Sequence, residues 1–162
     1  SLGGLPKADG LTKPKEADTP EHESQAGVEA KYEVVRLVHA TKFNPTGPKG
    51  ERLDSPNLIT RLTANTTPIE LPGFQTLLEV KCPQKRGGLV TVKMLDPKGN
   101  EVMKSEGSLA FGARDQTTFL IDWAPFTAPL PGKYVFVAEI GGQKVREEPL
   151  NLEVAKDQPK AP

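Results

Sequence analysis

Short segments in which apolar and polar residues alternate fill the second half of this chain, and they constrain its fold more than any other feature. A period of two places successive side chains on opposite faces of an extended strand, so each segment has one apolar face. No segment keeps the apolar spacing of an amphipathic helix over three turns. The pattern predicts an all-β fold in which about seven to eight strands form a two-sheet sandwich. The clearest segments are 89–96, 117–123, 133–140 and 144–154.

Two turn sequences separate these segments. The sequence Asp96-Pro97-Lys98-Gly99 matches a type I turn, because Asp favours the first position, Pro sets φ at the second and Gly fits the fourth. The pair Gly141-Gly142 fits a two-residue hairpin loop, where positive φ is needed and glycine adopts it without strain. Both turns therefore predict antiparallel neighbours.

The side chains on the apolar faces of the last strands are expected to form the centre of the core. Each of these faces belongs to an alternating segment that is bounded by turn residues, so its side chains are expected to meet between the two sheets. The residues are Phe119, Ile121, Tyr134, Phe136, Leu150 and Leu152.

The first half of the chain has fewer strand signals. Strands are expected near 32–38, 57–65 and 76–82, and a short strand is expected at 101–104. In 76–82, Cys82 shares a face with Leu78 and Val80, so we expect this thiol to be buried in the core. Three prolines and two glycines lie between residues 44 and 56, and that segment is predicted to be a loop.

The two ends of the chain differ in composition from the middle. Residues 1–30 contain only Leu2, Leu5, Leu11 and Val28 from the large aliphatic and aromatic types, and residues 156–162 are charged and proline-containing. Such segments bury too little surface to offset their ordering entropy. The prediction is a disordered tail or linker at 1–30, a β-sandwich domain at 31–155 and a disordered tail at 156–162.

Charge and hydropathy argue against two classes of protein. The chain has 21 Lys and Arg against 21 Asp and Glu, so the overall positive field that nucleic-acid binding requires is not visible. A local basic patch is possible at Lys81, Lys85 and Arg86, but a solvated loop and strand face is the favoured interpretation because Glu79 lies in the same stretch. No run approaches the roughly 18 apolar residues of a membrane span. Because the sequence begins with Ser1 and not Met, we expect a processed or excised form. The single cysteine forms no intrachain disulfide and leaves the compartment open.

The closing segments resemble a known group of domains. The sequence from Pro131 to Val137, the Gly141-Gly142 pair and the segment 148–152 resemble the closing hairpin of immunoglobulin-like bacterial domains and macroglobulin-type modules. The Asp-Pro-x-Gly turn at 96–99 adds to the resemblance, which covers 75–154. It implies an immunoglobulin-like topology, in which Tyr134 is the aromatic residue that begins the penultimate strand. The chain lacks the cysteine pair of antibody domains.

Few residues could support catalysis. The chain has two histidines, one cysteine and no zinc, thiol-redox or phosphate-loop motif. Glu147 and Glu148 point to opposite faces of a strand and cannot act together. Asp96, Asn100 and Asp115 could be assembled into a metal site, but turn capping is the favoured role of Asp96. The chain is therefore not expected to be an enzyme, and no catalytic, cofactor or metal residue is predicted.

The leading hypothesis is a non-catalytic module that binds another protein or forms part of a larger assembly. Unpaired edge strands are the expected docking element, because they offer free backbone donors and acceptors. Trp123 and Phe126 are the candidate contact residues for a partner or ligand. The alternative is a ligand-binding sandwich, with carbohydrate as the first choice. Trp123 also has a structural interpretation. It lies two residues after Ile121, so both side chains are expected on the same face of the strand, in the core.

Overall fold

The computed structural model describes residues 29–155, and its regular structure is entirely β. The predicted tails at 1–30 and 156–162 lie outside the described residues, apart from Glu29 and Ala30. The strands are β1 Glu33–Ala40, β2 Asn44–Thr46, β3 Arg52–Asp54, β4 Arg61–Ala64, β5 Ile69–Leu71, β6 Phe74–Lys81, β7 Gly88–Leu95, β8 Glu101–Leu109, β9 Gln116–Trp123, β10 Phe126–Ala128, β11 Gly132–Ile140 and β12 Gln143–Val154.

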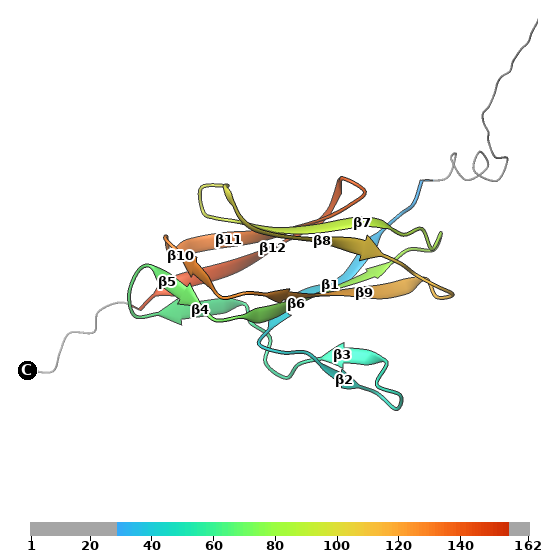
Figure 1. Cartoon of the computed structure of the whole chain (residues 1–162), viewed down its shortest axis with the longest axis horizontal. Coiled ribbons are helices and arrows are strands. Elements are labelled where there is room, and N and C mark those ends of the chain that lie inside the picture. Colours follow the sequence, from blue (N-terminus) through green and yellow to red (C-terminus); the bar gives the residue numbers. More distant parts are fainter. Residues whose placement is uncertain (1–28, 156–162) are drawn as a thin grey trace, which may run out of the picture. The chain divides into compact units, whose positions relative to one another are not determined.

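Two sheets form the sandwich, as the alternating pattern predicted. One sheet has three strands in the order β1-β6-β9, and the other has five in the order β4-β12-β11-β7-β8. All pairs within these sheets are antiparallel except β12 with β4. Figure 1 shows β7, β8, β11 and β12 in one layer and β1, β6 and β9 in the other. The fold is thus an all-β, two-sheet sandwich.

The core contains the residues that the alternation of apolar and polar positions predicted to face it. Tyr134, Phe136, Leu150 and Leu152 are fully buried, and Ile121 is almost so. Phe119 is half-buried, and its ring lies where a Cβ on Gly107 would stand. The Tyr134 hydroxyl donates to the carbonyl of Leu130 at 2.8 Å, which satisfies its polar atom at the edge of the core. Cys82 is also buried, as its face predicted.

The prediction of a loop at 44–56 is wrong, because this segment contains the β2–β3 hairpin. Pro45 pairs with Leu53 in a two-stranded sheet, where proline is tolerated since both strands are edges. The hairpin turns through Gly47 and Gly50, both with positive φ. Its apolar residue Leu53 packs, as does Val38, against a small buried cluster formed by Ala40, Phe43 and Leu77. Figure 1 shows the hairpin beneath the three-stranded sheet, and this cover explains why β6 is buried on both faces.

A charged network ties the hairpin to this sheet. Arg36 Nε donates to Glu79 Oε1 at 2.7 Å, and Arg36 Nη1 donates to Asp54 Oδ1 at 3.0 Å. Gln116 Nε2 donates to the second oxygen of Glu79 at 2.7 Å. Glu79 is only 5% exposed, so these partners offset the cost of burying its charge. The network therefore has a structural role.

The strand predicted at 101–104 is longer than expected. β8 continues to Leu109 and pairs with β7 through the register Gly88↔Leu109. Its inward positions are Met103, Ser105 and Gly107, which lie opposite buried residues of β7. Serine and glycine interrupt the apolar alternation, and this concealed the strand. The extension creates a long edge on the five-stranded sheet.

Candidate functional site

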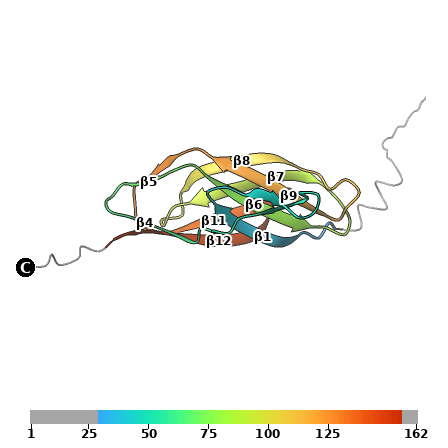
Figure 2. The same ribbon diagram turned by 90° about the horizontal axis from the view of Figure 1, so that it is seen from below.

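The two edges of one sheet lie near those of the other, so the sandwich has two sides where unpaired strand edges come together. One side joins β1 to β12, and the other joins β8 to β9. Figure 2 shows β8 along one side of the sandwich and β1 with β12 along the opposite side. Unpaired edges are the parts of a sandwich that can add a further strand. The two sides differ in the contacts that their edges already make within the chain.

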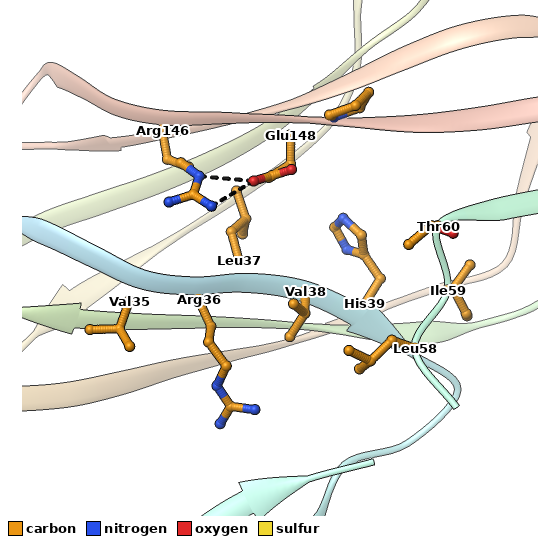
Figure 3. Close-up of a pocket in the computed structure, with 11 residues that line it drawn as sticks. Val35, Arg36, Leu37, Val38, His39, Leu58, Ile59, Thr60, Arg146 and Glu148 are labelled. Atoms are coloured by element: carbon orange, nitrogen blue, oxygen red, sulfur yellow. Dashed lines mark hydrogen bonds and ion pairs between the residues drawn. The ribbon is translucent and has the colours of Figure 1, made fainter. Parts of the chain in front are cut away.

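The β1–β12 side is closed by hydrogen bonds from within the chain. Arg146 Nη1 donates to the carbonyl of Val34 at 3.2 Å, and the amide of Ile59 donates to the carbonyl of His39 at 2.7 Å. Arg146 is itself held by Glu148, at 2.9 Å from its Nε (Figure 3). A pocket of about 200 Å³ remains between β1, β12 and residues 58–60. On this side, the backbone carbonyls of Val34 and His39 and the side chain of Arg146 therefore already have partners.

The strands of this side are also irregular. The β1–β6 register shifts at Val35, and the β11–β12 register shifts at Val145. Pro149 lies on the stretch of β12 before β4 joins it, so it stands on an edge as its residue type requires. Bulges and edge prolines are features that hinder pairing with a further strand.

His39 is one of several buried polar residues whose burial was not predicted from the sequence. It is 3% exposed, and its Nδ1 lies 2.8 Å from Thr76 Oγ1. The same hydroxyl accepts a hydrogen bond from Trp123 Nε1 at 2.7 Å, so three strands are linked through Thr76. His39 Nε2 has no partner among the described residues, and the ring stacks against Phe136 at 4.2 Å between centroids. Figure 3 shows His39 and Leu37 on the opposite face of β1 from Arg36 and Val38.

The surroundings of His39 determine its charge. Burial lowers the pKa of the imidazole from 6.5 to about 4, because desolvation disfavours the charged form. The residue is therefore neutral near pH 7.

Cys82, the one thiol, contacts Gln84 Oε1 at 3.4 Å. The described hydrogen bonds of His39 and Cys82 do not join them into a nucleophile–base pair.

The β8–β9 side is open by comparison. Among residues 29–155, β7 is the only strand that pairs with β8, and the register from Met103 to Leu109 is unbroken. A groove of about 400 Å³ lies beside this edge, lined by residues 103–105 of β8 and 122–126 at the junction of β9 and β10. This side therefore combines free backbone groups with a space that can receive a side chain.

The structure brings Trp123 and Phe126 to this groove. Trp123 is 7% exposed, with its indole packed near Phe74 and Phe136 and its Nε1 bonded to Thr76. Phe126 is half-buried and begins β10, where it pairs with Leu71. Met103 and Ser105 complete the groove, and sequence reasoning missed them because it ended β8 too early.

The three residues weighed as a metal site have other contacts. Asp96 Oδ1 accepts hydrogen bonds from the amides of Lys98 and Asn100, both at 2.9 Å. The bond from Asn100, followed by that from Lys98, lowers the pKa of Asp96. The carbonyl of Asp115 accepts the amide of Cys82. Across residues 29–155 there is no cluster of three or more His, Cys, Asp or Glu residues suited to a metal ion.

Within residues 29–155, no element is a helix of the length and apolarity that crossing a bilayer requires.

Comparison with known proteins yields one family and several distant structural relatives. Residues 57–153 match the model of a family of unknown function, DUF6941. No curated protein matches the chain. A β-glucosidase from Listeria innocua is 10% identical with a TM-score of 0.46, and the match covers 77% of this chain and 16% of that enzyme.

Two further solved structures are similar to this chain at low sequence identity. The alkylpurine DNA glycosylase AlkC from Pseudomonas fluorescens is 10% identical with a TM-score of 0.47, covering 76% of this chain and 31% of that one. An immunoglobulin-like protein from Pseudomonas aeruginosa is 13% identical with a TM-score of 0.39, covering 78% and 99%. The chain spans about a sixth of the β-glucosidase, and likenesses of this strength assign no activity.

Proposed function

This chain belongs to the family of unknown function DUF6941, and we propose that it is a non-catalytic, immunoglobulin-like β-sandwich module that binds a partner protein within a larger assembly. The observation that carries the proposal is the open β8–β9 side. There, an unbroken edge from Met103 to Leu109 borders a groove of about 400 Å³.

An edge and a groove together match a common mode of protein recognition. An extended segment of a partner can hydrogen-bond to the edge backbone, while one of its side chains enters the adjoining pocket. Met103 and Phe126 supply apolar contact in the groove, and Asp122 and Lys104 supply charged groups at its rim. Backbone pairing would give affinity, and the groove would select the side chain.

A non-catalytic role also fits the use of the polar residues. His39 bonds to Thr76 within the core, Glu79 is neutralised by Arg36, and Asp96 caps a turn. Each of these groups has a structural partner, and none of them lines the β8–β9 groove. Catalysis would need polar groups that converge on one open space. Glu79 does border a pocket of about 250 Å³ together with Glu51, Arg114 and Gln116, but both of its carboxylate oxygens are held, by Arg36 and by Gln116.

Carbohydrate binding is the alternative function. A sugar ring packs on the open face of an aromatic side chain, and the groove offers Phe126 and the small exposed part of Trp123. Because Trp123 is 7% exposed and its Nε1 is bonded to Thr76, we favour a protein partner. Titration with a glycan panel, monitored by Trp123 fluorescence, tests the alternative directly.

The proposal is tested by affinity capture with the full chain, followed by binding measurements with the purified partner. Phe126→Ala should weaken binding at least about tenfold, because it removes an aromatic contact from the groove. Leu58→Ala is the matched control, since Leu58 is exposed beside the opposite pocket. Binding that is lost with Leu58→Ala and kept with Phe126→Ala would contradict the proposal, as would saturable glycan binding without a protein partner.

A further inference from the structure

The edge of β8 has a sequence that is complementary to itself. Ser105 is flanked by Lys104 on one side and Glu106 on the other. Resting on the proposed function, we propose that the partner at this edge is a second copy of the chain. The two β8 strands would run antiparallel, with Ser105 of one copy opposite Ser105 of the other. The two five-stranded sheets would then continue into one another about a two-fold axis.

The charges favour this register. With Ser105 at the axis, Lys104 of each copy lies opposite Glu106 of the other, so the dimer gains two cross-strand pairs of opposite charge. Both side chains are accessible, with exposed fractions of 45% and 50%, and both lie on the face of β8 that points away from the core. In the isolated chain their charged ends are 3.8 Å apart, so the same groups are already neighbours along the strand.

The core-facing positions are also compatible with this register. Met103 of each copy would lie opposite Gly107 of the other. Gly107 has no side chain, and the ring of Phe119 occupies the space beneath it. Met103 would therefore pack against a half-buried aromatic ring that already fills the space left by Gly107.

Charged residues on an edge strand usually prevent unwanted pairing. On β8 the same charges would select one register, because a shift of two residues in either direction removes the match between Lys104 and Glu106. A shift of one residue also exchanges the apolar and polar faces. The edge would thus reject most strands and accept a second copy in one arrangement.

Sedimentation analysis of the full chain tests this proposal. Wild-type protein should dimerise reversibly at or below about 1 mM. Lys104→Glu and Glu106→Lys should each raise the dissociation constant at least about tenfold, because like charges then face each other at two places. An equimolar mixture of the two variants should form a heterodimer, and the double charge exchange should restore the homodimer.

Lys144→Glu is the matched control, because it makes the same charge change on the opposite edge, where Lys144 pairs with Glu147. It should leave the dimer unchanged, and thermal melting should show that every variant is folded. A wild-type chain that stays monomeric at 1 mM would overturn the proposal, and so would a dimer that ignores the exchanges at 104 and 106. Either failure leaves the proposed function standing if Phe126→Ala still weakens capture of a different protein.

Discussion

The two sides of the sandwich are built from the same kind of element, yet only one of them is closed. On the β1–β12 side, Arg146 caps the carbonyl of Val34, the amide of Ile59 caps that of His39, and bulges disturb both strands. On the β8–β9 side, the edge from Met103 to Leu109 is regular and borders a larger groove. On our proposal, an edge strand becomes a binding element because its neighbours leave its backbone groups unoccupied, and not because of its strand structure alone.

The closed side shows how an unpaired edge is protected without a covering strand. A single long side chain and one loop amide occupy backbone carbonyls, and Pro149 removes a donor. On the open side, opposite charges at alternate positions restrict which strand can pair. The first device occupies backbone acceptors, whereas the second leaves the backbone of β8 free and, on our proposal, would permit a complementary strand.

The largest expected effect comes from the core that both sides share. Phe136 is fully buried and contacts the rings of His39, Phe74 and Trp123. Phe136→Ala should lower the free energy of unfolding by about 3–5 kcal/mol, as measured by chemical denaturation. Glu139 points to the opposite face of β11 from Phe136. Glu139→Ala should therefore lower the free energy of unfolding by less than about 1 kcal/mol. Equal and small effects of the two changes would show that the strand register is wrong.

His39 makes the closed side sensitive to acid. Its pKa is 6.5 when unfolded and about 4 when folded, so the unfolded chain binds the proton first as the pH falls. The free energy of unfolding should therefore decrease between pH 6.5 and pH 4, by about 3 kcal/mol from this residue, and the loss should level off below pH 4. His39→Leu should remove this contribution. Identical pH profiles for the two proteins would contradict the burial of His39.

Phe126→Ala should reduce the binding of a partner more than it reduces the stability of the fold. It is half-buried, so Phe126→Ala should cost about 1–2 kcal/mol of stability, less than Phe136→Ala. Its effect on binding at the β8–β9 groove should be the greater one. Leu58→Ala, at an exposed position of the other side, should change stability by less than about 0.5 kcal/mol and leave association unchanged. Paired denaturation and binding curves measure both quantities, and an equal loss of association in the two variants would remove the distinction between the sides.

The smallest effect concerns Arg146. Arg146→Gln should cost about 1 kcal/mol or less, because the side chain is partly exposed and its bonds to Val34 and Glu148 are replaceable by water. Amide exchange in β1 near Val34 should nevertheless become faster. Arg61→Gln, which removes an exposed ion pair with Glu153, should change neither. Unchanged exchange in β1 would show that Arg146 does not close this side.

The parts of the fold that alternate strongly could be predicted from the sequence. β9, β11 and β12 each present large apolar residues to one face, so their parity identified Phe136 and Leu150 as core before any contact was known. β2–β3 could not be predicted, because Pro45 and two glycines resemble a loop when the covering contact with Leu77 is unknown. The contact joins segments that are distant in the sequence, so the sequence of the hairpin alone does not predict it.

The site was predictable only in part. Trp123 and Phe126 stood out as aromatic residues beside a proline turn, and both line the β8–β9 groove. Met103 and Ser105 were missed because small inward residues hide the length of β8. The bonds from Thr76 to His39 and Trp123 join three strands that are distant in sequence, so no local pattern could have indicated them.

Hydrogen exchange at low and high protein concentration tests the central difference most directly. Between Met103 and Leu109, the β8 amides that point away from β7 should gain protection as the concentration rises, because a second copy then bonds to that edge. Amides at 143–149 of β12 should exchange at the same rate under both conditions. Protection that appears on β12, or that fails to appear on β8 while the protein dimerises, would show that β8 is not the edge that pairs.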